Sequence, residues 1–144
     1  MGLPHVDHVS AVKSPTLIAI AVVEQDDHFL IGRRAADVPL AGLWEFPGGK
    51  VEPNETPAQA AVRECQEEAG VGVEVIETYS VQDFAYDHGQ LRLHFFACRP
   101  IERMPIPIHP FRWVSRADML QLEFPRANQV LLEQLAGHPI RNQI

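Results

Sequence analysis

One stretch, from Gly49 to Val71, constrains the fold of this chain more than any other part. Its sequence, GKVEPNETPAQAAVRECQEEAGV, carries the signals that begin and end a helix. Thr56 and Gln59 form a capping box around a proline at the first helical position. Gly70 provides the left-handed residue that commonly ends a helix. These signals predict a loop followed by a helix from Pro57 to Ala69.

Three glutamates share one face of this helix. Glu64, Glu67 and Glu68 stand at i, i+3 and i+4, so their carboxylates lie within a single turn. Clusters of this kind are most often solvated acidic faces. Near a helix C-terminus, however, acidic side chains oppose the helix dipole and require a compensating cation. A hard divalent ion bound by oxygen ligands is the second interpretation, and the residues around the helix decide between the two.

The whole stretch resembles the Nudix box, G-x5-E-x7-R-E-U-x-E-E-x-G-U, in which U is an apolar residue. The matching positions are Gly49, Glu55, Arg63, Glu64, Cys65, Glu67, Glu68, Gly70 and Val71. If each of the seven fixed identities is a chance of roughly one in twenty, all seven coincide on the order of once in a billion starts. The chain is identified as a member of the Nudix hydrolase family. The resemblance implies an α/β fold, the Nudix α/β/α sandwich with a mixed β-sheet.

The resemblance also implies a role for each polar residue of the box. Glu64, Glu67 and Glu68 bind Mg²⁺, or Mn²⁺ in its place, with the carbonyl of Gly48 as a further ligand. One of these glutamates activates the attacking water. Arg63 completes the catalytic set by pairing with the carboxylates and orienting them, although an ordinary surface ion pair is the alternative. Mg²⁺ keeps positions for water and substrate phosphates, as phosphoryl displacement requires.

Three further segments resemble the MutT-like branch of the family. They are Gly32–Asp37 (GRRAAD), Leu43–Lys50 (LWEFPGGK) and Phe124–Asn128 (FPRAN). The resemblance implies that Arg34 contacts phosphate, that Phe46 lies by the base and that Asn128 reads the purine edge. The substrate-binding residues expected on this basis are Arg34, Glu45, Phe46, Pro47, Gly48 and Asn128.

The Asn128 amide offers one acceptor and two donors. It can accept from the N7–H that oxidised guanine gains and donate to O6, whereas ordinary guanine has a bare N7 acceptor. We therefore expect Mg²⁺-dependent hydrolysis of 8-oxo-dGTP or related nucleoside triphosphates to the monophosphate and pyrophosphate. The alternatives are purely structural roles: a helix cap for Asn128, a solvated strand residue for Arg34 and a core residue for Phe46. For the whole chain, the alternatives are hydrolysis of CTP, another dNTP or a nucleotide sugar.

One segment departs from the MutT-like pattern. MutT-like and CTP-cleaving relatives usually carry a glutamate in the loop before the last strand, whereas Met104–Trp113 holds no carboxylate. Glu102 is the nearest one upstream, and His109 is a poor ligand for Mg²⁺. This departure motivates a third alternative, a Nudix domain that binds a nucleotide without cleaving it.

Composition narrows the remaining possibilities. A length of 144 residues, with 46% hydrophobic and 22% charged, is typical of one globular domain. The formal charge of −7 argues against a nucleic-acid polymer or an anionic membrane as partner. Cys65 and Cys98 form no disulfide framework or metal-ligand spacing, which fits the cytoplasm. We expect a monomer or a homodimer.

Outside the box, the pattern predicts strands and helices in alternation. We expect strands at 16–24, 29–33, 73–83, 91–99 and 111–114, an irregular segment at 99–110, a short helix from Ser115, and a last helix at 128–136 ended by Gly137. Residues 1–15 are expected to form a flexible N-terminal arm or a partial edge strand, and residues 16–144 the single Nudix domain.

Overall fold

The computed structural model describes residues 14–141, so almost all of the expected N-terminal arm lies outside the described residues. Seven strands form one sheet. The strands are β1 (Thr16–Gln25), β2 (His28–Arg33), β3 (Trp44–Glu45), β4 (Gly48–Lys50), β5 (Val73–Tyr86), β6 (Gly89–Pro100) and β7 (Arg112–Ser115). The helices are α2 (Pro57–Ala69), α3 (Arg116–Met119) and α4 (Gln129–Arg141), with a 3-10 turn, η1 (Arg126–Asn128), before α4. None of these helices is long and apolar enough to cross a bilayer.

The sheet is mixed, as the sequence predicts. Its central path runs β3-β2-β1-β6-β5, with β4 paired to β1 and β7 paired to β2. β1 and β6 are parallel, in a register that places Ile18 beside Leu93, and the other pairs are antiparallel. The β5–β6 hairpin extends three residues beyond the predicted end of its first strand, to the Tyr86–Gly89 pair. An ion pair between Asp83 and Arg92 lies at the start of this extension.

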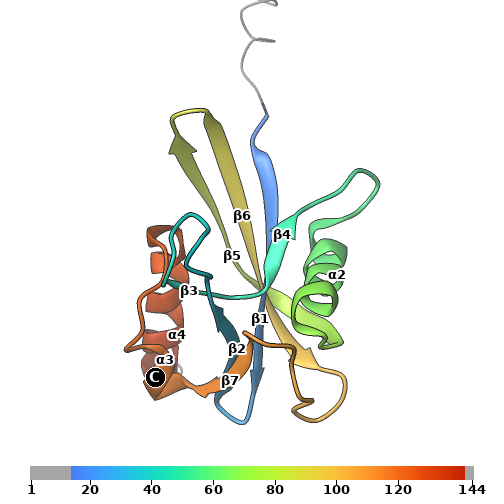
Figure 1. The fold of residues 1–144 in the computed structure, drawn as a ribbon, viewed down its shortest axis with the longest axis vertical. Helices are drawn as coiled ribbons and strands as arrows, with labels where there is room; N and C mark the ends of the chain where they lie inside the picture. The colour runs from blue at the N-terminus through green and yellow to red at the C-terminus, as the bar shows by residue number, and fades with distance from the viewer. Residues whose placement is uncertain (1–13, 142–144) are drawn as a thin grey trace, which may run out of the picture.

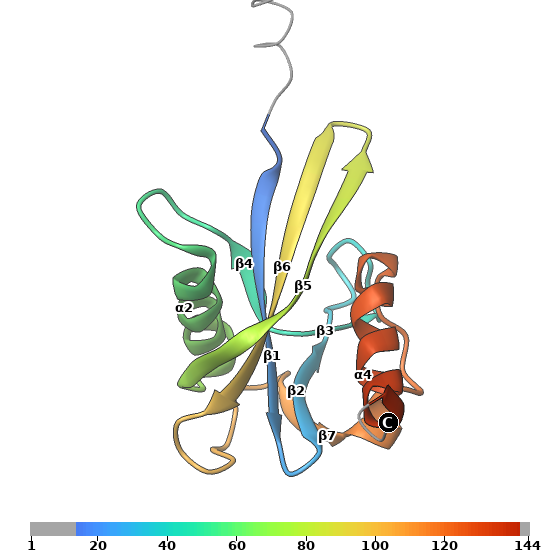
Figure 2. The same ribbon diagram turned by 180° about the vertical axis from the view of Figure 1, so that it is seen from behind.

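Helices cover both faces of the sheet, which confirms the predicted α/β/α sandwich. Figure 1 shows α2 on one side of the sheet and α4 on the other, and Figure 2 shows the same layers from behind. Successive residues of β1 face opposite sides, as the pleat requires. Ala19 and Ala21 join the core under α2, whereas Ile20 and Val22 join the core under α4.

Helix α2 has the predicted bounds and caps. The Thr56 hydroxyl accepts from the Gln59 N–H at 3.1 Å, and the Gln59 side chain accepts from the Thr56 N–H at 2.9 Å. Gly70 ends the helix at φ 68°, a left-handed conformation that favours glycine. The buried face of the helix is small, with Ala60, Ala61, Cys65 and Ala69 against the sheet.

The predicted end of the last helix is wrong. Helix α4 continues through Gly137 to Arg141, and it begins at Gln129, after the 3-10 turn that contains Asn128. A glycine inside a helix costs about 1 kcal/mol relative to alanine but does not forbid the helix. Leu131 and Leu135 are buried in the core beneath α4. Their burial outweighs the local preference of Gly137.

Candidate active site

The acidic face of α2 lies against strand β4, which brings the two glycines of the box next to the carboxylates. The Gly48 N–H donates to Glu68 Oε1 at 3.1 Å. A Cβ on Gly49 would overlap the Glu64 carboxylate, and a Cβ on Gly48 would meet the Ala19 carbonyl oxygen. The glycines are therefore required for the approach of β4 to α2 and β1, whatever ligand the site holds.

Arg63 connects the loop before α2 with the acidic face. Its Nε and Nη2 donate to the two oxygens of Glu55 at 2.7 and 3.0 Å, and Nη1 donates to both Glu64 and Glu67 at 3.1 Å. The Lys50 carbonyl accepts a further bond from Nη2 at 3.0 Å. The Arg63 guanidinium lowers the pKa of Glu55, and Glu55 in turn raises the pKa of Arg63. These contacts go beyond an isolated surface pair between residues i and i+4.

Glu64 and Glu68 form a pair of like charges at the centre of the site. The Glu64 side chain is only 16% exposed. Burial, together with the nearby carboxylates of Glu64 and Glu45, raises the pKa of Glu68 to about 7, although the bond from Gly48 opposes the shift. A bound cation relieves this repulsion. Glu67 is 58% exposed and accepts from the same Arg63 nitrogen as Glu64.

These donors suit a hard cation that keeps several of its waters. Among the side chains that the structure describes, no group of three His, Cys, Asp or Glu is placed to hold a metal ion by itself. Mg²⁺ is characteristically held by one or two carboxylates together with water and substrate phosphates. Glu64 and Glu68 would supply those carboxylates, next to Gly48 and Gly49 of β4.

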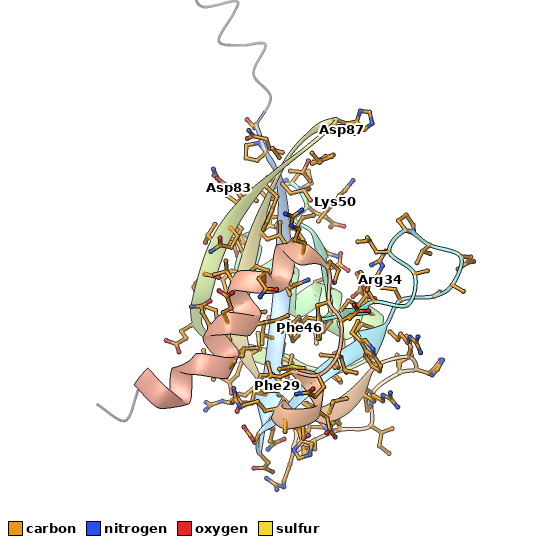
Figure 3. The ribbon with its side chains drawn as sticks, turned by 90° about the vertical axis from the view of Figure 1, so that its left-hand side faces the viewer. Phe29, Arg34, Phe46, Lys50, Asp83 and Asp87 are labelled. Atoms are coloured by element: carbon orange, nitrogen blue, oxygen red, sulfur yellow. The ribbon has the colours of Figure 1, made fainter. Side chains whose placement is uncertain are left out.

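A cleft of about 220 Å³ lies on the α4 side of this centre. Its apolar walls are Ile18 and Ile20 from β1, Leu93 from β6, Phe46, Pro125 and Ala127. Phe46 stacks on Phe124 with ring centroids 5.1 Å apart. Figure 3 shows Phe46 between α4 and Arg34, in the middle of the molecule. Apolar walls of this kind with few polar groups are typical of a small-molecule site.

Asn128 provides the polar group of this cleft. It is only 8% exposed, and it is the one buried polar side chain in the part of the chain that the structure describes. Its Nδ2 donates to the Pro125 carbonyl at 3.3 Å. Because a carbonyl oxygen only accepts, this bond determines which side of the amide carries the nitrogen. Among the described residues, no hydrogen-bond donor reaches its Oδ1, so this oxygen caps no described backbone N–H of α4.

A second cleft, of about 470 Å³, joins the first to the acidic centre. It shares Arg34, Glu45 and Gly48 with the first cleft and adds Glu68 and Phe111. Arg34 lies at the junction, where Nη1 pairs with Glu45 at 2.7 Å and Nε donates to the Pro39 carbonyl at 2.8 Å. Because they share these three residues, the two clefts form one groove with Asn128 in one part and Glu68 in the other.

Comparison with known proteins identifies the family. A family model described as the NUDIX domain matches residues 18–134. The chain belongs to the Nudix hydrolase family. The 8-oxo-dGTP diphosphatase of Escherichia coli (strain K12) is 33% identical to it over 121 residues, covering 82% of this chain and 94% of that protein. The CTP pyrophosphohydrolase of the same strain is 35% identical over 114 residues, covering 65% and 82%.

Solved structures agree with this assignment. The solution structure of the E. coli ORF135 protein superposes with a TM-score of 0.75 at 31% identity, covering 92% of this chain and 96% of that chain. A structure of MutT, from a study of the Aliivibrio salmonicida and Vibrio cholerae enzymes, has a TM-score of 0.62 at 30% identity and covers 87% and 99%. The chain is thus a MutT-like Nudix pyrophosphohydrolase, and the predicted family, fold and enzyme class are confirmed.

The Nudix groove brings together most, though not all, of the residues predicted to bind substrate. Arg34, Glu45, Phe46, Gly48 and Asn128 all line the 220 Å³ cleft. Pro47 is fully buried, and its carbonyl accepts from the Ala21 N–H at 2.9 Å, so its contribution visible in this structure is to anchor the segment to β1.

Sequence reasoning missed the apolar walls of the Nudix groove. Ile18 and Leu93 are far apart in the chain and become neighbours only through the parallel pairing of β1 and β6. The sequence around Ile18 or Leu93 does not distinguish either residue from an ordinary residue of the hydrophobic core. Glu102, the carboxylate nearest to the departing loop, lines a separate cleft with Gly70 and Ile101, and His109 lines one with Arg112.

Proposed function

We propose that this Nudix pyrophosphohydrolase cleaves 8-oxo-dGTP or related nucleoside triphosphates to the monophosphate and pyrophosphate, with Mg²⁺ or Mn²⁺ as its cofactor. The observation that carries the proposal is the buried Asn128 amide, which faces an apolar cleft joined to the acidic centre of the box. The 33% identity to an 8-oxo-dGTP diphosphatase over most of both chains supports it.

Base recognition follows from the unused hydrogen-bonding groups of Asn128. One amide proton is held by the Pro125 carbonyl, which leaves Oδ1 and the second proton for a ligand. Oδ1 accepts from the N7–H of an 8-oxopurine, and Nδ2 donates to O6. Ordinary guanine presents a lone pair at N7 instead, so Oδ1 would face another acceptor. The walls formed by Ile20, Leu93 and Phe46 cover the faces of the base.

The groove then directs the triphosphate past Arg34 and Gly48 toward Glu68. Glu64 and Glu68 would hold the divalent ion, which would neutralise phosphate charge and make water more acidic. The oxygen of the attacking water bonds to phosphorus while the bridging P–O bond breaks, and pyrophosphate leaves with the bonding pair. A glutamate of the box accepts the water proton. Arg63 keeps Glu64 and Glu67 in place throughout, so catalysis is mainly positioning and electrostatics.

Hydrolysis of CTP is the second candidate. The 35% identity to a CTP pyrophosphohydrolase favours it, and the edge of cytosine also presents a donor and an acceptor to an amide. A nucleotide sugar or another dNTP would share the phosphate groove but not the Asn128 contacts described above.

The test is pyrophosphate release from a panel of substrates, each with Mg²⁺ and with a chelator. The panel contains NTPs, dNTPs, 8-oxo-dGTP, ADP-ribose and a dinucleotide. Chelator-sensitive release with the highest kcat/KM for 8-oxo-dGTP supports the proposal. A higher kcat/KM for CTP would support the pyrophosphohydrolase reaction but identify CTP as the substrate. No turnover on any member, despite measurable nucleotide binding, contradicts the proposal and favours a domain that only binds its ligand.

A further inference from the structure

A third cleft continues the groove beyond Glu68. It has a volume of about 340 Å³ and is lined by Arg33, Trp44, His109, Pro110, Phe111 and Arg112, together with Pro107. Arg33, Pro110 and Phe111 also line the cleft that contains Glu68, so the two cavities adjoin. None of the predicted substrate-binding residues lines this third cleft.

The charge of this cleft contrasts with the rest of the protein. The chain has a formal charge of −7, and most arginines in the described residues are paired with carboxylates. Within that part of the chain, neither Arg33 nor Arg112 forms an ion pair. Two unpaired guanidinium groups in one cleft create a local positive potential that attracts anions.

The pairing of the strands explains why the two arginines meet. Arg33 is opposite Trp44 in the β2–β3 pair, and Ile31 is opposite Arg112 in the β2–β7 pair. Opposite residues share a face of the sheet, and so do Ile31 and Arg33, which are two apart on β2. The side chains of Arg33 and Arg112 therefore lie on the same face of the sheet. Arg112 is opposite Ile31, which precedes Arg33 by two residues on β2.

Both guanidinium groups are held in position. The Arg112 Cζ lies 4.9 Å from the centroid of the Trp44 ring. A cation–π contact consumes no N–H donor, and no side-chain hydrogen bond engages Arg112 among the described residues, so its guanidinium N–H groups remain available to phosphate oxygens. Arg33 Nε donates to the Gly42 carbonyl at 3.2 Å, which leaves its terminal nitrogens for a ligand.

We propose that Arg33 and Arg112 bind the terminal phosphate of the substrate and, after cleavage, the pyrophosphate product. This inference rests on the proposed function, because it requires a triphosphate whose base lies in the Asn128 cleft. Arg34 is already engaged by Glu45, whereas Arg33 and Arg112 have no carboxylate partner among the described residues. The terminal phosphates carry the most negative charge, so they are most stable where cations have no competing carboxylate.

The first experiment measures pyrophosphate binding by calorimetry with the metal removed by a chelator. The wild type is compared with Arg33→Gln, Arg112→Gln and the double variant. We expect the dissociation constant to rise by about tenfold for each single variant and further for the double variant, since each loses a charge-assisted contact. Arg99→Gln is the matched control, because Arg99 is exposed and pairs with Glu74 away from the cleft.

The second experiment separates the terminal phosphate from the rest of the nucleotide. We expect both variants to raise KM for the best triphosphate substrate by about tenfold while changing the affinity for its diphosphate less than twofold. Arg112→Lys keeps the charge and loses the planar fork, so we expect an intermediate KM. Thermal unfolding of each variant reports any loss of the stacking on Trp44.

The outcomes are distinct. Equal losses for triphosphate and diphosphate, or unchanged pyrophosphate binding in the double variant, overturn the proposal. Orthophosphate binding as tightly as pyrophosphate also overturns it, because the cleft would then be a general anion site. If the wild type cleaves no triphosphate but the variants still weaken pyrophosphate binding, the proposed function fails and the pyrophosphate site stands.

Discussion

Arg63 holds Glu55 through two parallel hydrogen bonds, from Nε to Oε2 at 2.7 Å and from Nη2 to Oε1 at 3.0 Å. A bidentate pair of this kind fixes direction as well as distance. It joins the loop before α2 to the helical face that bears Glu64 and Glu67, both of which accept from the remaining nitrogen of Arg63. Glu55 is therefore a positioning residue, acting on the carboxylates through Arg63.

Substitution Glu55→Gln tests this relationship. Glutamine keeps one acceptor oxygen and replaces the other with an NH2 group that cannot accept from Arg63, so Arg63 is free to turn away from Glu64. We expect kcat to fall by about tenfold with little change in KM, because substrate contacts are unaffected. The control is Glu52→Gln, since Glu52 is 63% exposed and 3.8 Å from Arg63. Similar kcat values for the two variants would show that the Arg63–Glu55 pair does not align the site.

The same pair predicts a dependence of stability on pH. Arg63 lowers the pKa of Glu55 in the folded protein, so the pair stabilises the fold above the ordinary pKa of glutamate and ceases to do so as the pH falls through the lowered value. We expect wild-type and Glu55→Gln proteins to differ in free energy of unfolding at pH 7 and to converge as the pH falls through the lowered pKa of Glu55. Urea titrations at several pH values measure this, and a constant difference would contradict it.

Local signals explain which elements were predictable. The capping box, the proline at the first position of α2 and Gly70 act within a few residues of the helix, and the helix has the predicted bounds. Strands β3 and β4 were not predicted, because they are two and three residues long and Pro47 lies between them. They exist because β2 and β1 provide their partners.

The residues of the candidate site also fall into two groups, those that local sequence predicts and those that depend on long-range strand pairing. The carboxylates of the box follow from helical spacing, which is local. The apolar wall of the base cleft and the meeting of Arg33 with Arg112 depend on strand register, which no short segment of sequence contains. At Gly137 the local sequence predicts the end of a helix, but α4 continues through this residue. The burial of Leu131 and Leu135 in the core outweighs the local signal.

Glu68→Gln is expected to abolish turnover and stabilise the metal-free protein. Because the pKa of Glu68 in the fold is about 7, the fold favours its protonated form, and stability falls as the pH rises from the ordinary pKa of glutamate through the raised value. At pH 8 the charged group destabilises the fold. Removal of the charge should raise the free energy of unfolding by about 1 kcal/mol after allowance for solvent screening. Thermal unfolding in chelator at pH 8 should therefore shift upward by a few degrees. Glu67→Gln, at a more exposed position, should not show this gain.

Gly49→Ala is expected to separate β4 from α2. The added Cβ overlaps the Glu64 carboxylate, which must move away from Arg63 and Glu68. We expect kcat to fall by roughly tenfold or more and the midpoint of thermal unfolding to decrease. Gly72→Ala is the matched control, since its Cβ would meet neighbours only at ordinary contact distances from 3.6 Å. Equal effects of the two substitutions would remove the steric explanation.

Asn128→Ala tests base recognition directly. Truncation removes the acceptor for N7–H and the donor for O6 while leaving the apolar walls and the phosphate groove intact. A site that pairs with a substrate N–H commonly discriminates by several orders of magnitude, so we expect kcat/KM for 8-oxo-dGTP to fall by about 100-fold or more. The value for dGTP should change much less, because its bare N7 has no proton for Oδ1. Gln129→Ala, at the exposed next position, controls for disturbance of α4. Parallel losses for both nucleotides would assign Asn128 a structural role and leave the discrimination between them to the rest of the cleft.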